Sequence, residues 1–369
     1  MKQQIVIIGA GLSGLYAAYL LEQRGYSPRL LEARARLGGR IMGSAAANRT
    51  HEFEFGPSWF WPELNPRMQE LLTALQLPYF NQHTIGATLS ESASQTLQRW
   101  DNADDDIAYQ RLEGGMTMLI KTLSARLKCT EVQLDSQVQD IRQRDDGRLD
   151  LSLLHQGQSE LIVADRVITA MPPRLLAHSM AWLPALPPAL TAQWSDTPTW
   201  MAGQAKLVAT YPHAFWRTAG CSGEARSQRG PMTEIHDASN ADGSQAALFG
   251  FIGLPAATRQ HYGREQLIAL GLQQLVRLFG PEAATPDWIE IKDWATDAHT
   301  ATAADSQAVR HHPTYRKPAL PAHWADRVFL AGTEFSARYG GFMEGALDAA
   351  QQAVLALDQH LTAAGSVPA

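Results

Sequence analysis

The chain has 369 residues, 45% of them hydrophobic, and a formal net charge of −6 at pH 7. That length allows two domains with cores of their own, and the acidic balance argues against nucleic acid or an anionic membrane surface as a partner. No apolar run is long enough to span a bilayer, and the N-terminus enters a strand directly, without room for a signal peptide. Cys129 and Cys221 form neither a metal-binding spacing nor a disulfide framework. We therefore expect a soluble cytoplasmic protein.

The first forty residues predict a dinucleotide site. An apolar strand pattern at residues 5–8 leads into a Gly-x-Gly-x-x-Gly turn formed by Gly9, Gly11 and Gly14. In this motif the first glycine permits a tight turn, the second lets the backbone approach a pyrophosphate, and the third lets the following helix pack closely. The helix N-terminus adds free N–H groups that face the phosphate. Glu32 ends the next apolar run and can accept hydrogen bonds from ribose hydroxyls.

The residues after Glu32 favour FAD over NAD as the dinucleotide. The stretch 33–40 carries three arginines and the pair Gly38-Gly39, and it ends at Arg40. A glycine pair flanked by arginines suits a second close approach to a phosphate or ribityl chain, because guanidinium matches phosphate in shape and charge. A basic solvated loop is the alternative interpretation of this stretch.

The middle of the chain alternates strand and helix patterns. The polar run 95–106 indicates a solvated loop. The expected helices cover residues 119–127 and 264–278, and the expected strands cover 137–144, 149–154, 161–163, 165–170, 203–211, 232–235 and 246–252. Turns are expected at Asp145-Asp146-Gly147 and Gln156-Gly157-Gln158, where a glycine follows polar residues.

A third glycine-containing segment lies near the C-terminus. The apolar run 328–331 predicts a buried strand, and Gly332-Thr333-Glu334 follows it. Gly340-Gly341 then precede a long helical pattern that ends at about Leu361. These two glycines would let a flat ring approach the start of that helix, whose positive end suits an anionic reduced flavin. A glycine-rich loop before a terminal amphipathic helix is the alternative.

Taken together, these motifs resemble the flavin-containing amine oxidases of the monoamine oxidase family. Order and approximate spacing hold from Ile5 to about Val354, and the last block is more specific to amine oxidases than the first. The matching residues are Gly9-Ala10-Gly11-Leu12-Ser13-Gly14, Leu31-Glu32-Ala33-Arg34, Gly38-Gly39-Arg40, Phe55-Gly56-Pro57-Ser58-Trp59, Val167-Ile168-Thr169-Ala170-Met171-Pro172-Pro173, Lys206 ahead of Phe215-Trp216, Leu330-Ala331-Gly332-Thr333-Glu334 and Gly341-Phe342-Met343-Glu344-Gly345-Ala346.

The resemblance implies an α/β fold with two domains. An FAD-binding Rossmann-like domain of the glutathione-reductase type would comprise residues 1–66, 113–194 and 297–369. A mixed-sheet α+β substrate domain would comprise residues 67–112 and 195–296. The segment between Ser58 and Gly114 is shorter than in familiar members, where it roofs the substrate cavity. We therefore expect a cavity that is more open, or one that a partner subunit caps.

The same resemblance implies the reaction. An amine is oxidised at its CH–NH group to an imine, with hydride transfer to flavin N5 and reoxidation by molecular oxygen to hydrogen peroxide. Some relatives tether FAD to a cysteine just after Trp294, and no cysteine stands there, so we predict noncovalent FAD. The cofactor-binding residues implied are Gly9, Gly11, Leu12, Ser13, Gly14, Glu32, Ala33, Arg34, Gly39, Arg40, Gly56, Pro57, Ser58, Val138, Trp294, Gly332, Thr333, Glu334, Gly341, Phe342 and Met343.

Lys206, Phe342 and Trp59 are the candidate catalytic residues. Lys206 lies in an apolar strand pattern, and an inward position would bury it and lower its pKa, whereas an outward, solvated lysine is the alternative. By resemblance, Lys206 holds a water against flavin N5. Phe342 stands where the family usually has one tyrosine of an aromatic pair that flanks the amine. The second tyrosine is not evident, so Trp59, Tyr339 or Phe60 would line the cavity, with core packing as the alternative for each.

Two other functions stay open at this point. FAD-dependent desaturases and dehydrogenases of the same superfamily share the scaffold without requiring Lys206 or the block at 341–345 in this form. A flavin-binding protein without turnover is the third hypothesis, because the roof is short and the aromatic pair incomplete. His299, His311 and His312 match no metal-ligand spacing, so we predict no metal and assign them to the surface or to packing. The sequence names neither the amine nor the oligomeric state, for which a homo-oligomer is one option.

Overall fold

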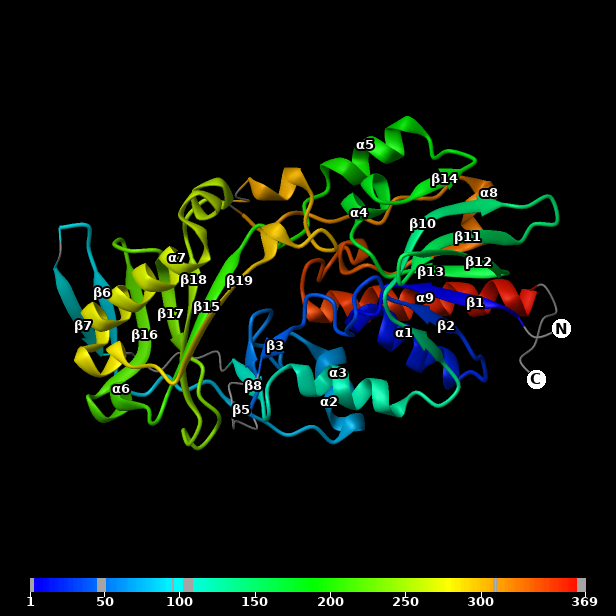
Figure 1. Ribbon diagram of the computed structural model, residues 1–369. Helices are drawn as coiled ribbons and strands as arrows, with labels where there is room; N and C mark the ends of the chain where they lie inside the picture. Colours follow the sequence, from blue (N-terminus) through cyan, green and yellow to red (C-terminus); the bar gives the residue numbers. More distant parts are fainter. Residues whose placement is uncertain are drawn as a thin grey trace.

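The computed structural model describes residues 3–44, 51–94, 96–101, 109–307, 309 and 311–363. In these ranges the chain forms two lobes that lie end to end (Figure 1). One lobe is built on a parallel sheet and the other on a seven-stranded mixed sheet. None of the helices in the described ranges has both the length and the apolar character needed to cross a membrane.

The parallel sheet of the first lobe has the strand order β20-β13-β1-β2-β9. Its central strand β1 pairs with β13 on one side and β2 on the other, so the strand order reverses at β1. In open parallel sheets, ligands bind beyond the carboxyl ends of the strands at such a reversal. The strands are β1 Ile5–Ile8, β2 Arg29–Leu31, β9 Glu131–Gln133, β13 Arg166–Thr169 and β20 Val328–Leu330.

Alternate side chains of β1 enter two different cores. Ile5 and Ile7 pack against the helices α1 Leu12–Glu22, α2 Pro66–Leu75, α3 Thr117–Arg126 and α9 Met343–Ala363. Val6 and Ile8 pack on the other face against a second sheet of strand order β12-β11-β10-β14 and short helices. These elements are β10 Ser136–Gln143, β11 Leu149–His155, β12 Gln158–Ala164, β14 Ala181–Leu183, α4 Pro173–His178, α5 Pro188–Asp196 and α8 Ala322–Ala325.

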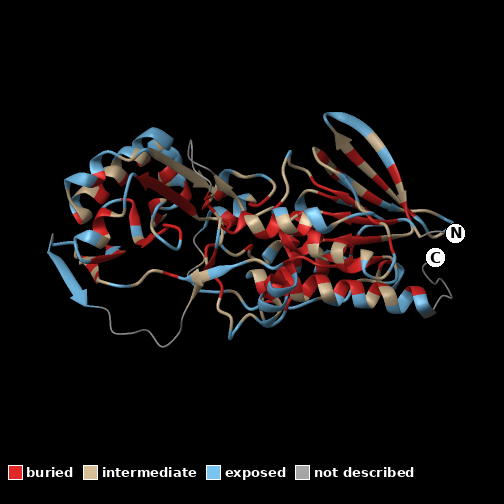
Figure 2. Ribbon diagram, turned by 90° about the horizontal axis from the view of Figure 1, so that it is seen from below, coloured by how far each residue is buried: buried red, intermediate tan, exposed pale blue. Residues whose placement is uncertain are grey.

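The sheet of the second lobe has the order β19-β15-β18-β17-β16-β6-β7. Neighbours are antiparallel except β16 and β6, which run parallel. Figure 2 shows buried residues between the layers, and β7, at the sheet edge, is exposed along its length. The elements are β6 Ala87–Glu91, β7 Leu97–Asp101, β15 Ala205–Tyr211, β16 Cys221–Ser227, β17 Met232–Asp237, β18 Ala246–Ile252, β19 Trp288–Asp293, α6 Phe215–Thr218 and α7 Ala256–Phe279.

The two faces of this second sheet have different partners. One face packs on α7, through Leu207, Leu248 and Leu275. The opposite face carries Val208 and Phe249, which pack on Phe53 and Phe55 from the segment that leaves the first lobe. That segment holds the short pair β3 Gly43–Ser44 and β4 Phe53–Glu54, and a second short pair joins β5 Tyr79–Asn81 to β8 Gln110–Leu112. Lys206, one residue before Leu207, therefore lies on the face that is turned toward the first lobe.

Helix α2 packs in the first lobe, although the predicted division assigns nearly all of its residues to the substrate domain. Its buried residues Met68, Leu71, Leu72 and Leu75 belong to the same core as α1, α3 and α9. We propose that the FAD-binding domain extends through α2, so that the first segment of the substrate domain begins after it rather than at residue 67. The remaining predicted bounds, 113–194, 195–296 and 297–369, stand as part of the same proposal.

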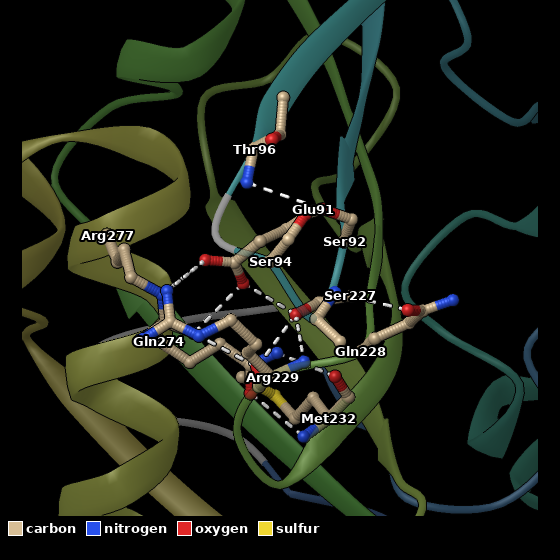
Figure 3. A network of polar contacts seen from close by, with 11 residues as sticks. Glu91, Ser92, Ser94, Thr96, Ser227, Gln228, Arg229, Met232, Gln274 and Arg277 are labelled. Atoms are coloured by element: carbon tan, nitrogen blue, oxygen red, sulfur yellow. Dashed lines mark hydrogen bonds and ion pairs between the residues drawn. The ribbon is translucent and has the colours of Figure 1, made fainter.

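A polar network fastens α7 to the sheet (Figure 3). Glu91, at the end of β6 and only 3% exposed, accepts hydrogen bonds from Arg277 Nε at 2.6 Å and from Ser227 Oγ at 2.7 Å. Gln274 of α7 accepts from the backbone N–H of Met232 at 2.9 Å and donates to the carbonyl of the same residue at 2.6 Å. Because these groups satisfy one another away from water, the network fixes how α7 sits on the sheet.

The predicted elements largely agree with the structure, with one correction. The predicted strands correspond to β10, β11, β12, β13, β15, β17 and β18, and positive φ values at Gly147, Gln156 and Gly157 confirm both turns. The solvated loop predicted for 95–106 is wrong at Leu97–Asp101, which pairs with β6 as β7, while residues 95 and 102–106 lie outside the described part. Strands β16 and β19 and helices α4 and α5 were not predicted.

Candidate active site

The glycine turn after β1 lets the end of β1, the start of α1 and the turn at Gly38-Gly39 lie close together. Gly9 has φ +97°, and a Cβ at Gly14 would overlap the carbonyl oxygen of Gly9, so the start of α1 can sit this close to β1 only with glycine. Gly11 forms an isolated bridge with Gly38 of the second glycine cluster, and a Cβ on Gly39 would lie 3.1 Å from Gly11 Cα. Two glycine turns separated in sequence thus meet at the N-terminus of α1, as the spacing predicts.

Glu32 and Arg34 are held by partners within the protein. Glu32 is 3% exposed, and its carboxylate accepts the backbone N–H of Ala10 at 2.7 Å and that of Arg34 at 3.0 Å. The guanidinium of Arg34 donates to Asp297 at 2.6 Å and to Thr300 at 2.7 Å. Arg34 is therefore already paired, and the segment that follows β19 forms part of this wall.

Arg40 and Glu334 form an ion pair between the two ends of the chain. Arg40 Nη1 lies 2.7 Å from Glu334 Oε1, and Glu334 is completely buried. Glu334 Oε2 has no hydrogen-bond partner among the described residues. Arg40 lines the cavity described below and Glu334 does not, so Glu334 lies behind the arginine rather than against a ligand.

The two glycines of the C-terminal pair, Gly340 and Gly341, have different surroundings. Gly341 has φ +82° and lines the cavity, and a Cβ there would lie 2.8 Å from Trp200 Cβ. A Cβ on Gly340 would overlap the ring of Tyr315, so this glycine makes room for a buried tyrosine rather than for a ligand. The expectation that both glycines face a flat ring is therefore wrong for Gly340. Thr333 Oγ1 donates to the carbonyl of Phe342 at 2.7 Å and ties the turn to the start of α9.

Lys206 lies in a strand that is buried along its whole length. Its side chain is 2% exposed, and Nζ donates to Ser58 Oγ at 2.7 Å and to the carbonyl of Gly56 at 3.2 Å. The same atom lies 3.7 Å from the centre of the Phe249 ring. Burial lowers the pKa of Lys206 from 10.5 to about 7. The inward, buried position expected for Lys206 is thus found in the structure.

Two charged groups act on the pKa of Lys206 beyond burial. Glu54 opposes the shift and Arg111 adds to it. These two residues are themselves buried and form an ion pair with 3.0 Å between Arg111 Nη2 and Glu54 Oε2. Their opposite charges largely cancel at Lys206, so removal of the amine from water remains the main cause of its lowered pKa.

One large cavity of about 990 Å³ collects these groups between the lobes. Its walls contain residues from the N-terminal turn, from the segment around Ser58, from β10, β15 and η2 (Trp294–Thr296), and from the start of α9. Gly14 and Glu334 are the two predicted site residues that do not line it. Those that do are Gly9, Gly11, Leu12, Ser13, Glu32, Ala33, Arg34, Gly39, Arg40, Gly56, Pro57, Ser58, Trp59, Val138, Lys206, Trp294, Gly332, Thr333, Gly341, Phe342 and Met343.

Aromatic side chains form part of the cavity wall. Phe342 is 44% exposed and stacks on His312, with 4.7 Å between ring centres and 9° between planes. Trp294 Nε1 donates to the carbonyl of Phe55 at 2.9 Å, which fixes its indole at the wall. Tyr339 also lines the cavity, whereas Phe60 does not and is 1% exposed, as expected of core packing.

Sequence reasoning missed several lining residues, among them Trp61, Trp200, Met201 and Phe251. Met201 has φ +62°, a backbone conformation rare for a residue other than glycine, and strain of this kind often marks functional walls. The only available signal was the cluster Trp200-Met201 just before the Lys206 strand. The histidines behave as predicted for packing in one case, because His312 supports the Phe342 ring.

Neither cysteine lies at this cavity. Cys129 is exposed, and Cys221 belongs to the core beneath α7. The described residues also contain no group of three or more His, Cys, Asp or Glu side chains placed to hold a metal ion. The donor set is thus one of backbone N–H groups, arginines and apolar rings, which suits a large organic anion with a flat ring.

The profile of the flavin containing amine oxidoreductase family matches residues 79–357, and that of an NAD(P)-binding Rossmann-like domain matches residues 7–75. The chain therefore belongs to the flavin-containing amine oxidoreductase family. The predictions of an α/β fold with a Rossmann-like domain and of FAD as cofactor are confirmed at the level of this family.

Individual relatives agree with this placement. A probable flavin-containing monoamine oxidase A of Dictyostelium discoideum is 30% identical over 191 residues, 49% of this chain and 39% of that protein. Amine oxidase B of Mus musculus is 22% identical over 479 aligned positions, 100% of this chain and 88% of that protein. The alignment to a putative monoamine oxidase of Mycobacterium tuberculosis spans 55% of that protein.

Solved structures share the fold. Cyclohexylamine oxidase from Brevibacterium oxydans IH-35A superposes with a TM-score of 0.80 at 20% identity, covering 98% of this chain and 100% of that one. Putrescine oxidase bound to putrescine superposes with a TM-score of 0.77 at 19% identity, covering 97% and 99%.

Proposed function

We propose that the protein holds FAD noncovalently and oxidises the CH–NH group of a small amine to an imine, with hydride transfer to flavin N5 and reoxidation by molecular oxygen to hydrogen peroxide. The carrying observation is that Lys206, buried and with Nζ fixed, lines the same cavity as the glycine turns from both ends of the chain. Membership of the amine oxidoreductase family supports the reaction class.

The residues present fit FAD. Gly11 and Gly39 line the cavity and lie so close together that a Cβ on Gly39 would be 3.1 Å from Gly11 Cα, so glycine lets the two turns meet beside the N-terminus of α1. Ser13 Oγ donates to the carbonyl of Ala331, which joins that helix start to the end of β20. Arg40, fixed by Glu334, contributes a positive charge at the cavity wall. When bound, FAD would supply the two-electron acceptor that amine oxidation requires.

Lys206 is the group that we assign to proton movement. With a pKa near 7, its amine changes protonation state close to neutral pH, so it can hold or release a proton at Nζ. Ser58 Oγ and the carbonyl of Gly56 fix the position of Nζ, and Phe249 closes one side. Ser58 and Gly56, expected to bind the cofactor, are thus proposed to position this lysine as well.

The aromatic walls are assigned to substrate binding. Phe342, Trp59 and Phe251 line the cavity that Lys206 also lines, with the Phe251 ring centre 5.6 Å from Nζ, and we propose that these apolar faces orient a neutral amine while they exclude water. Phe342 lacks the hydroxyl of the family's usual tyrosine, and its stacking on His312 holds the ring in place instead.

Anaerobic mixing of the FAD-loaded protein with a panel of primary and secondary amines tests this function. Bleaching of the flavin band by an amine, followed by its recovery with release of peroxide when air is admitted, is the expected result. A flavin that bleaches rapidly with a compound containing no nitrogen, and slowly with every amine, would point to a desaturase and overturn the proposal. A flavin that responds to no compound would overturn it in favour of binding without turnover.

A further inference from the structure

A second cavity of about 250 Å³ lies beside the first, at the far side of two tryptophans. Trp59 and Trp61 line both cavities, so the two spaces meet at these indoles. Tyr109 completes an aromatic wall, with its ring centre 5.5 Å from that of Trp59 and 6.4 Å from that of Trp61. Aromatic faces around a small space suit an organic cation, because the ring quadrupole attracts positive charge.

The remaining wall carries two carboxylates with a histidine between them. Glu234 Oε1 lies 2.8 Å from His236 Nε2, and Glu224 Oε1 lies 3.5 Å from His236 Nδ1. The nearby His236 and the hydrogen bond from Tyr109 together outweigh burial and hold the pKa of Glu224 below its usual range, and a hydrogen bond from His236 lowers the pKa of Glu234. Both are therefore ionised at neutral pH.

His236 gives an independent sign of an incomplete site. It is 7% exposed and lines the second cavity, and its Nδ1 has Glu224 at an ion-pair distance of 3.5 Å but no hydrogen bond of normal geometry among the described residues. Buried polar atoms normally make close hydrogen bonds, so an atom with only this long contact at a cavity wall indicates room for a further polar partner. Arg226, which also lines this cavity, is exposed and is the one positive side chain among the lining residues other than His236.

A single phenyl ring separates this cluster from the proposed reaction centre. Lys206 Nζ lies 3.7 Å from the centre of the Phe249 ring, and that centre lies 5.3 Å from the centre of the His236 ring. Trp59 stands against the same histidine, with 4.7 Å between ring centres. Because these distances are short, a substrate whose two amines are joined by a few methylene groups could place one amine near Lys206 and the other near Glu224 and Glu234.

We propose that the second cavity binds a second cationic group of the amine substrate, which makes the preferred substrate a diamine or polyamine. The inference rests on the proposed function of the first cavity and names its substrate class. The ammonium group at the far end would lie between the indoles, Glu224 and Glu234, while the amine to be oxidised lies near Lys206. Arg226 on β16 opposes binding, and a proton on His236 competes with the ligand for the same two carboxylates.

Tetramethylammonium tests the second cavity without turnover, since it carries no N–H group. In calorimetric titration of the FAD-loaded protein, we expect one site whose affinity falls at least about tenfold in E224Q/E234Q and rises in R226Q. The exposed change E265Q on α7 removes one carboxylate charge away from the cavity and should leave the affinity unchanged. Affinity should also rise with pH as His236 loses its proton, because its neighbours Glu224, Glu234 and Arg226 keep their charges.

Steady-state kinetics then test the link to the substrate. 1,4-Diaminobutane and n-butylamine differ only in the second amine, and we expect E224Q/E234Q to raise KM for the diamine at least about tenfold while KM for butylamine stays within about twofold. Unchanged butylamine kinetics also show that this variant folds and binds FAD. Equal effects on both amines, or tetramethylammonium binding that ignores the two carboxylates, would overturn the inference. Oxidation of neither amine would instead refute the proposed function, while the titration still decides the cation site.

Discussion

Replacing Lys206 by methionine should stabilise the folded protein while it slows turnover. Burial lowers the pKa of Lys206 from 10.5 to about 7, so at pH 7 and below the folded state carries a cost of about 5 kcal/mol for holding this amine away from water. Methionine removes that cost but leaves Ser58 Oγ and the carbonyl of Gly56 without their donor, which costs about 1–3 kcal/mol. The expected net gain in the free energy of unfolding at pH 7 is about 2–4 kcal/mol.

The pH dependence gives this prediction its sharpest form. Between the folded and unfolded pKa values the unfolded chain binds a proton at Lys206 that the folded protein does not, so wild-type stability rises with pH there. Relative to Lys206→Met, the wild type should gain about 1.4 kcal/mol per pH unit from about pH 7 to pH 10. The advantage of the variant therefore shrinks as the pH rises.

Urea unfolding of the FAD-saturated wild type and Lys206→Met, followed by tryptophan fluorescence at several pH values, measures this difference. The same preparations should show flavin retained by the variant and a slowed turnover or reoxidation. Parallel stability curves across this pH range, or a variant that is less stable than the wild type at pH 7, would refute the reasoning from burial.

Three further changes test other parts of the structure. Ser58→Ala removes an acceptor from the Lys206 ammonium, so the break in the pH profile of turnover by the flavin-loaded protein should move to lower pH; an unmoved break contradicts the positioning role. Gly14→Ala forces a Cβ onto the Gly9 carbonyl and should cost about 3 kcal/mol or more in urea unfolding and abolish flavin retention, so a variant with full flavin content would exclude the close-packing argument. Glu91→Gln should destabilise the protein by about 1–2 kcal/mol at pH 7, because hydrogen bonds from Arg277 lower the pKa of Glu91 and stabilise its charged form. That difference should vanish as the pH falls through the lowered pKa of Glu91, and a difference that persists after its protonation would show that charge is not its origin.

The sequence predicted the meeting of the two glycine turns at the cavity because each turn is defined by local spacing. The glycine turn after β1 and the pair at Gly38-Gly39 each need only a few consecutive residues to define them, and the structure brings them into contact. Lys206 was harder, since β15 is buried on both faces and shows no alternation that would give its direction. There the family resemblance decided correctly between two open orientations.

The site residues that the sequence did not predict correctly share a physical cause, because their positions depend on contacts between distant segments. Gly340 is glycine because of Tyr315, twenty-five residues earlier in the chain, and Glu334 is buried because of Arg40 at the other end. Trp200 and Met201 reach the cavity only because the chain folds back before β15. No local pattern contains this information, so such residues could be found only from the folded structure.

The two ends of the large cavity differ in how their charges are arranged, and this difference explains how one site can hold an anionic cofactor and act on an amine. At the glycine end, Arg34 and Arg40 are each fixed by an acid from a distant segment, so little side-chain entropy is lost when they meet a ligand. At the other end Lys206, which is buried, has neutral acceptors and a lowered pKa, so it repels an amine less when it is neutral. Under the proposed function, the fixed positive groups would thus lie where the phosphates bind and away from the amine.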